Sequence, residues 1–348
     1  MNDYTEISFP GLGIKWNPDS VLSIGSLSIH YYGLIIALGM ALAVLYGWKR
    51  SKQFGIKQDH ILDGVLIIVP IALICARLYY CLFQWKEGGY AENPISILYI
   101  WEGGLAIYGG VIGAVVAIAV FCKVKKIKLA ALLDLVFLGF LIGQSIGRWG
   151  NFFNREAFGV ETNSFLKMGL MNAVTGKVTY HHPTFLYESL WNAIGFVLLH
   201  FLSKRRKYDG QIALGYCAWY GLGRAVIEGL RTDSLYIGNT DLRVSQLLAA
   251  LSCVVAVAAL LMMSFKTHDK AKLFVNQVSF DEEDEEDEES EETAEVEEAE
   301  EDGESEETAE VEEVEEVEEA EEVEEAEEVE KTEEVEKTEE VEKTETTE

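Results

Sequence analysis

The amino-acid sequence predicts an all-α polytopic membrane protein with seven transmembrane helices and a disordered acidic tail. Seven apolar runs have about the 20 residues that a helix needs to cross a bilayer. The loops between these runs alternate between rich and poor in Lys and Arg, as the loops of multi-pass membrane proteins do. The formal net charge of −31 over 348 residues comes from one terminal segment.

The charge separates the chain into two unlike parts. Residues 281–348 hold 42 acidic residues and three lysines, whereas residues 1–280 hold 17 acidic and 25 basic residues. A segment so charged and so poor in apolar side chains cannot build a core. We therefore predict that residues 281–348 form a disordered, Glu-rich tail and that the preceding residues carry the fold. Nothing in the sequence indicates a nucleic-acid partner.

The apolar runs give the predicted helices in chain order. They are Tyr31–Trp48, His60–Phe83, Leu105–Cys122, Leu129–Gly147, Thr184–Leu202, Gln211–Leu230 and Val244–Phe265. Residues 31–265 form the predicted transmembrane domain. Residues 1–30 precede it without the basic start and cleavage site of a secretory signal peptide, and residues 266–280 form a basic linker to the tail.

The basic residues also predict the orientation of the chain. They follow the first, third, fifth and seventh runs, in the groups Lys49–Lys57, Lys123–Lys128, Lys204–Lys207 and Lys266–Lys272. Cytoplasmic loops carry the excess of Lys and Arg. We therefore expect the amino terminus outside, the linker and tail in the cytoplasm, and residues 148–183 as an outer-face loop or cap.

A cluster of polar residues ends the fourth run, in the string GRWGNFFNREAFG from Gly147 to Gly159. An ionisable side chain at membrane depth is costly unless it is paired, so such residues are candidates for a functional site. The alternative is that Arg148 is an interfacial arginine whose head group reaches the lipid headgroups. The clustering and the outer, normally arginine-poor face favour a site.

A second polar group lies on the sixth run, where Tyr220, Arg224 and Glu228 are four residues apart and share one helix face. The arginine and the glutamate could simply neutralise each other within the membrane. Pairing and function are compatible, so both interpretations stay open. Arg77 is a further cation in an apolar run, and a structural pair with an acid such as Glu102 or Asp134 is an equal alternative for it.

The string G-R-x-G-N-F-x-N-x-E-x-x-G resembles the signature of the bacterial phosphatidylglycerol–prolipoprotein diacylglyceryl transferase family, and every fixed position is filled. Four further elements are similar to family elements in the same order. They are HYYGL with Tyr32, IYGGVIG with Tyr108, HPTFLYE with His182, and Y-x-x-x-R-x-x-x-E from Tyr220 to Glu228.

Two positions depart from the family pattern. Phe185 replaces the usual glutamine of the HPTFLYE element, and His182 in that element could equally be a residue at the entry to a helix. Tyr108 stands where many relatives carry a histidine that has been proposed as a base. Tyrosine is a poor base at neutral pH but can donate a hydrogen bond.

The resemblance implies an enzyme of the bacterial cytoplasmic membrane. It would transfer the diacylglyceryl group of phosphatidylglycerol to the lipobox cysteine thiol of a preprolipoprotein signal peptide and release glycerol phosphate. Guanidinium groups suit the departing phosphate because they bind its oxygens bidentately and stay charged. Glu228, Glu156 or His182 could accept the thiol proton. The chemistry requires no metal or other cofactor, and the five scattered cysteines form no ligand pattern.

These inferences define two overlapping sets of candidate residues. The catalytic candidates are Arg148, Arg224, Glu228, Tyr108 and His182, and the phospholipid-binding candidates are Arg148, Asn151, Asn154, Glu156, Gly159, Tyr32 and Tyr220. Two rival classes of function remain. One is a transporter that uses the same arginines to bind and release a phosphate or a lipid. The other is a membrane receptor or scaffold whose acidic tail recruits basic partners.

Overall fold

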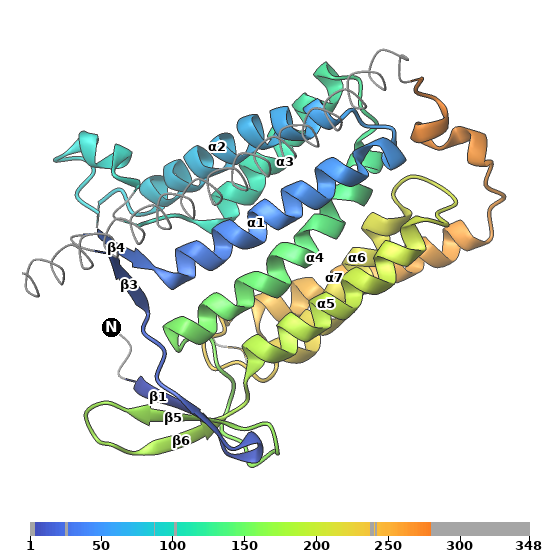
Figure 1. Ribbon diagram of the computed structural model, residues 1–348. Helices are drawn as coiled ribbons and strands as arrows, with labels where there is room; N and C mark the ends of the chain where they lie inside the picture. The colour runs from blue at the N-terminus through green and yellow to red at the C-terminus, as the bar shows by residue number, and fades with distance from the viewer. Residues whose placement is uncertain are drawn as a thin grey trace, which may run out of the picture. The chain divides into compact units, whose positions relative to one another are not determined.

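The computed structural model describes residues 4–24, 27–86, 88–100, 103–236, 240 and 242–279. The predicted disordered tail, residues 281–348, lies outside this part of the chain. The described residues contain seven long α-helices (Figure 1). These are α1 (Tyr31–Arg50), α2 (Gln58–Phe83), α3 (Ile107–Val124), α4 (Leu129–Asn154), α5 (Thr184–Ser203), α6 (Gln211–Glu228) and α7 (Val244–Ser264). Short 3-10 helices are η1 (Pro10–Leu12), η2 (Ser51–Phe54), η3 (Pro94–Leu98), η5 (Lys270–Lys272) and η6 (Phe274–Asn276).

Six of these helices, α1 to α5 and α7, are long and apolar enough to cross a membrane. The chain is thus a mostly helical, multi-pass membrane protein. Helix α6 carries Arg224 and Glu228 and is not one of the six. The seventh span and the orientation of the chain therefore stay predictions.

Helix α4 is the centre of the helical bundle. It packs against α1 on one side and against α5 and α6 on the other, while α2 pairs with α3 and α6 with α7 (Figure 1). Leu135, Leu138 and Leu141 of α4 are at most 1% exposed. Large apolar side chains on other helices, such as Leu66 and Val254, are exposed by 73% and 65%. Such surfaces suit contact with lipid, where every backbone polar group is satisfied inside a helix.

The prediction of an all-α chain missed six short strands in the described part of the chain. Strands β1 (Tyr4–Phe9), β2 (Ile14–Trp16), β5 (Met168–Asn172) and β6 (Val178–His181) form an antiparallel sheet in the order β2-β1-β5-β6, and β3 (Val21–Ile24) pairs with β4 (Leu27–His30). Strands of three to six residues are invisible to a search for apolar runs of helical length. Because Ile7 pairs with Leu170, the sheet joins the segment before α1 to the segment after α4.

This sheet packs against the end of α4. Ile7, Met168 and Leu170 share a buried cluster with Phe152 of α4 and Phe185 of α5. The side chain of Arg155, directly after α4, donates hydrogen bonds to the carbonyl oxygens of Thr5 and Pro18. The sheet therefore holds the last turn of α4, which carries the polar string that begins at Gly147.

Candidate active site

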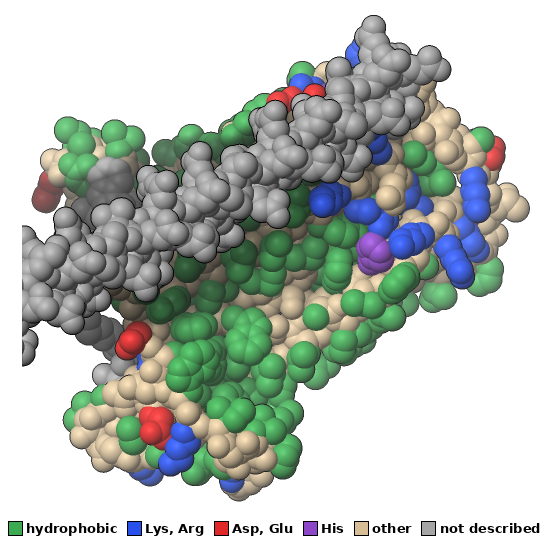
Figure 2. Space-filling model, viewed as in Figure 1, with side chains coloured by type: hydrophobic (Ala, Val, Ile, Leu, Met, Phe, Trp, Pro, Cys, Tyr) green, Lys and Arg blue, Asp and Glu red, His purple; other side chains and the backbone are tan. Residues whose placement is uncertain are grey.

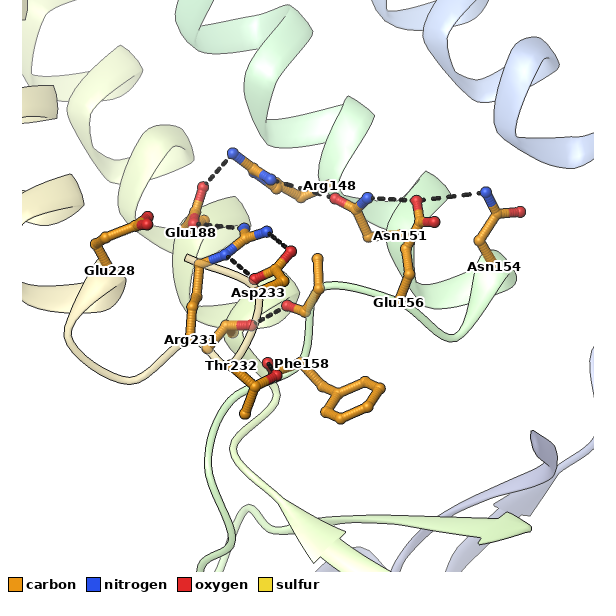
Figure 3. A network of polar contacts seen from close by, with 12 residues as sticks. Arg148, Asn151, Asn154, Glu156, Phe158, Glu188, Glu228, Arg231, Thr232 and Asp233 are labelled. Carbon is orange, nitrogen blue, oxygen red and sulfur yellow. Dashed lines mark hydrogen bonds and ion pairs between the residues drawn. The ribbon is translucent and has the colours of Figure 1, made fainter. Parts of the chain in front are cut away.

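Three arginines from different parts of the chain converge on one buried carboxylate. Figure 3 shows two of them, Arg148 and Arg231, beside Glu188. Glu188, in the second turn of α5, is only 3% exposed. Its Oε2 lies 2.5 Å from Nη2 of Arg148 on α4, and its Oε1 lies 2.6 Å from Nη1 of Arg224 on α6. Nη1 of Arg231, in the loop after α6, approaches Oε1 to 3.5 Å. We call Glu188 and these three residues the arginine cluster.

Two further carboxylates balance the charge of the arginine cluster. Nη2 of Arg224 lies 2.5 Å from Oε2 of Glu228, one turn further along α6, so the pairing that the spacing allowed is present. Nε and Nη2 of Arg231 donate to the two carboxylate oxygens of Asp233 at 2.9 and 2.6 Å. The three cations therefore face three anions. Arg148 is the most exposed of the three arginines, with 23% of its side chain accessible.

The Arg231–Asp233 pair is held in its charged form. Burial works against the charge of Arg231, but hydrogen bonds to Asp233 and the charges of Asp233, Glu188 and Glu228 raise the pKa of its guanidinium. Burial likewise raises the pKa of the Asp233 carboxyl, but Arg231 outweighs it and holds that pKa below its usual range. Both charges of the pair are therefore kept in the loop after α6.

A chain of amide groups extends the cluster along the end of α4. Nη1 of Arg148 donates to Oδ1 of Asn151 at 3.3 Å, and Nδ2 of Asn151 donates to Oε1 of Glu156 at 2.9 Å. Asn154 donates to the same oxygen at 3.4 Å. Glu156 reaches back to the helix because Arg155 caps α4 in the left-handed region, at φ +53°, and turns the chain. The sequence-predicted residues of this string thus lie together.

Glycines of the string allow two close approaches. A Cβ on Gly159 would lie 2.8 Å from Cβ of His182 and 2.9 Å from the carbonyl oxygen of Leu230. Gly159 can therefore form its bridge to Arg231, which joins the loops that follow α4 and α6. A Cβ on Gly150 would lie 2.7 Å from the ring of Tyr32. The ring of Tyr32, from α1, consequently packs against α4 at Gly150, two residues after Arg148.

A pair of tryptophans sets the register of α5 against α6. Nε1 of Trp191 donates to the carbonyl oxygen of Trp219, Nε1 of Trp219 donates to that of Trp191, and the rings stack at 4.3 Å. Each indole lies over a glycine of the opposite helix, Gly195 or Gly223. Glu188 lies about one turn before Trp191. These two reciprocal hydrogen bonds therefore place the carboxylate of Glu188 opposite α6, within reach of Arg224.

Four predicted site residues, Tyr32, Tyr108, His182 and Tyr220, lie outside the hydrogen bonds and ion pairs of the arginine cluster and its chain of amide groups, as far as the described chain extends. Nδ1 of His182 pairs with the hydroxyl of Tyr187 at 3.2 Å, and its backbone N–H donates to Val160 just before α5 begins. This geometry agrees with the helix-entry interpretation of His182. Tyr108, at the start of α3, is 49% exposed, and the ring of Tyr220 stacks on Tyr216 at 5.5 Å.

Arg77 has a structural role with partners that the sequence did not indicate. Its guanidinium donates to four backbone carbonyls, of Ser96, Ile97, Gly103 and Gly104. Asp134 accepts instead from the backbone N–H groups of Gly210 and Ala213, so it is not the partner of Arg77. Glu102 lies outside the described residues.

The sequence analysis missed three members of the site, Glu188, Arg231 and Asp233. Glu188 closes the HPTFLYE element, at the start of an apolar run, and a buried acid there is a functional candidate in its own right. Arg231 directly follows the predicted run Gln211–Leu230. No sequence spacing predicts its contact with Glu188, because that contact depends on how the loop after α6 packs against α5.

Comparison of the sequence with known proteins identifies its family. The family model described as "Prolipoprotein diacylglyceryl transferase" matches residues 19–263 of the chain. The chain belongs to this family. The match includes every residue of the arginine cluster and ends before the acidic tail.

Named relatives agree with the family over nearly their whole length. The phosphatidylglycerol–prolipoprotein diacylglyceryl transferase of Bacillus velezensis is 43% identical over 260 residues, which cover 73% of this chain and 93% of the relative. The protein of the same name from Ligilactobacillus salivarius is 44% identical over 248 residues, covering 69% and 90%. That of Listeria monocytogenes serotype 4a is 40% identical over 257 residues, covering 72% and 91%. The matched part of this diacylglyceryl transferase family member thus covers most of the length of each relative, and the acidic tail lies outside the residues that match the family model.

Proposed function

We propose that this chain transfers the diacylglyceryl group of phosphatidylglycerol to the lipobox cysteine of a preprolipoprotein. The names of its relatives supply the reaction. The observation that carries the proposal is the convergence of Arg148, Arg224 and Arg231 on Glu188 at one end of an apolar bundle. An arrangement of guanidinium groups beside lipid is suited to a phospholipid phosphate.

The reaction needs a site of this kind because its leaving group is a phosphate. The cysteine sulfur forms a bond to a glycerol carbon of the lipid, and the bond from that carbon to the phosphate oxygen breaks. The bonding electrons leave with glycerol phosphate, which gains negative charge as the bond breaks. Fixed donors aimed at this oxygen stabilise the charge more strongly where water is scarce. Arg148 is the most exposed of the three arginines, and it is proposed to contact the phosphate first.

Glu188 positions the arginines before the lipid arrives. Three guanidinium groups at the end of the bundle would repel one another and lose hydration without a shared anion. The carboxylate of Glu188 pairs with one side of each guanidinium group. The remaining N–H groups of Arg148 and Arg224 can then donate to a phosphate. Asn151 and Asn154 are proposed as neutral donors beside them, held by Glu156.

The other predicted residues keep proposed roles around this centre. Glu228, Glu156 and His182 are the candidates for accepting the thiol proton, which must leave before the sulfur attacks well. Tyr108 is proposed as a hydrogen-bond donor. Tyr32, Tyr220 and Gly159 are proposed to shape the phospholipid site, and two of them are supported by the close approaches at Gly150 and Gly159.

We also propose that α6 is the seventh span. Its 18 residues rise about 27 Å, close to the thickness of the hydrocarbon core. Helix α6 lies between α5 and α7 in the chain and packs on both, so its polar face can turn to the bundle interior. The basic loops support an outer-face arginine cluster and a cytoplasmic tail in a bacterial cell membrane.

Thioether formation tests the proposed function. Purified full-length protein in detergent, given phosphatidylglycerol and a peptide with a lipobox cysteine, should yield a diacylglyceryl peptide and an equal amount of glycerol phosphate. A peptide with serine in place of the cysteine, and phosphatidylcholine in place of phosphatidylglycerol, are the matched controls. A protein that moves phosphatidylglycerol across a liposome without modifying the peptide would contradict the proposal and favour the transporter.

A further inference from the structure

Another buried arginine lies at the opposite end of the bundle from the arginine cluster. Tyr31, the first residue of α1, stacks on Phe153 of α4 at 5.1 Å, close to the cluster. Arg50 is the last residue of the same helix, so it lies about 28 Å further along the bundle. Arg50 is only 8% exposed. Its charge therefore requires compensation from nearby groups.

The contacts of Arg50 supply no negative charge. Its Nη1 lies 3.3 and 3.4 Å from the two ring nitrogens of His200 on α5, and its Nη2 donates to Oγ of Ser203 at 3.1 Å. The guanidinium carbon lies 5.8 Å from the ring centre of Tyr46. Its Nε is buried without a hydrogen-bond partner in the described structure. Within the described ranges no carboxylate lies at ion-pair distance from Arg50.

Two buried acids at this end of the bundle have other partners. Asp209 pairs with Lys128 at 2.9 Å and accepts from the backbone N–H of Phe274. Asp134 accepts from two backbone N–H groups at the start of α6. A second arginine, Arg206, is also 8% exposed, and its Nη2 donates to a backbone carbonyl at 2.6 Å. Nε of Arg206 also lies 4.0 Å from Oδ1 of Asp209. Arg206 therefore shares this acid with Lys128, whereas Arg50 has no carboxylate at ion-pair distance in the described residues.

The surface beside Arg50 combines basic and apolar side chains. Lys204 follows α5 directly, is exposed, and places its Nζ 5.4 Å from the ring centre of Phe201, which is itself 62% exposed. Lys49 precedes Arg50 and is exposed. Figure 2 shows Lys and Arg side chains gathered beside a histidine at this end of the molecule, next to a broad hydrophobic face. A ligand that fits both surfaces has an anionic head and an apolar body.

We propose that Arg50 and Lys204 bind the phosphate group of an anionic phospholipid, whose acyl chains lie along Phe201. The phosphate supplies the negative charge that Arg50 lacks, and basic pockets between helix ends are suited to such headgroups. A lipid fits better than a free phosphate ester because the exposed ring beside Lys204 gains contact with acyl chains. In the orientation proposed above, this lipid belongs to the cytoplasmic leaflet.

Binding of phosphatidic acid to the full-length protein tests this proposal. Native mass spectrometry in detergent would count bound phosphatidic acid and give its apparent Kd for wild type, Arg50→Gln, Lys204→Gln and the control Lys123→Gln. Lys123 is an exposed lysine near the end of α3 and has the same charge change. All four proteins keep the arginine cluster, so any binding there is common to them and cancels in the comparison.

We expect Arg50→Gln to weaken one binding event by about tenfold or more, Lys204→Gln by about fivefold, and Lys123→Gln not at all. Glycerol 3-phosphate and inorganic phosphate, added at the concentration of the lipid, should not displace it. Displacement by either would overturn the assignment to a lipid. Wild-type affinity in both Arg50→Gln and Lys204→Gln would overturn the site. If Arg50→Gln does not fold, Lys204→Gln alone decides, and unchanged affinity there overturns the proposal.

Discussion

Glu188 occupies a position where three guanidinium groups approach two carboxylate oxygens. It is almost fully buried, so its charge and those of Arg148 and Arg224 depend on one another. The remaining groups of the site reach it through these arginines, which also bond to Asn151 and Glu228. The loss of one carboxylate should therefore disturb the whole cluster.

We expect Glu188→Gln to lower both stability and turnover. The amide keeps the shape of the carboxylate but leaves three arginines without their shared anion. Breaking a buried pair in this way costs on the order of 3 to 5 kcal/mol. Thermal unfolding in detergent and the thioether assay would measure the two effects. Glu161→Gln makes the same change at an exposed position near the site and should behave as wild type. Equal stability and turnover in Glu188→Gln and Glu161→Gln would contradict the role of Glu188.

At the scale of helices, the site depends on the register between α5 and α6. The two indole N–H groups each bond to the backbone of the opposite helix, and each ring fills the space over a glycine. A shift of one helix by a single turn would move Glu188 about 5 Å away from Arg224. The tryptophan pair lies in the bundle and touches no proposed substrate, so its effect on the reaction acts through position.

Gly223→Ala should weaken the pairing of Trp191 with Trp219. The new Cβ would lie 2.2 Å from Nε1 of Trp191, so the indole must move and its hydrogen bond to Trp219 is lost. Overpacking of this kind costs on the order of 1 to 3 kcal/mol, and we expect a lower unfolding temperature with a parallel loss of turnover. The control is Gly143→Ala on α4, where a Cβ would meet only the carbonyl oxygen of Gly39, at 3.8 Å. Wild-type stability and turnover in Gly223→Ala would show that the register tolerates the methyl group.

At the scale of the whole molecule, local features were predictable from the sequence and long-range contacts were not. The predicted run Thr184–Leu202 agrees with α5, and the run Tyr31–Trp48 begins with α1. Arg148, Asn151 and Glu156 lie together because a helix end and its cap bring close neighbours in sequence into contact. Glu188 and Arg231 join them through the packing of separate helices and loops, and the pairing of β1 with β5 spans more than 150 residues. Neither contact leaves a periodic signal in the sequence.

The acidic tail should be dispensable for the reaction. It begins after the residues that match the family, which end at residue 263. All residues of the arginine cluster precede it. Deleting residues 281–348 should leave the thioether assay in detergent within about twofold of the full chain, because the proposed leaving-group site is complete without them. A loss of turnover in the truncated protein, at unchanged unfolding temperature, would assign the tail a part in the reaction.

The central claim is that the guanidinium group of Arg148 stabilises the departing phosphate, and Arg148→Lys tests it most directly. Lysine keeps the charge but lacks the planar pair of donors. Glycerol phosphate release would be measured in a single turnover at saturating phosphatidylglycerol, with Arg205→Lys, an exposed arginine at the other end of the bundle, as the control. We predict that Arg148→Lys lowers the rate by about a hundredfold or more, while Arg205→Lys is unchanged. A folded Arg148→Lys protein that releases glycerol phosphate at the wild-type rate would contradict the claim.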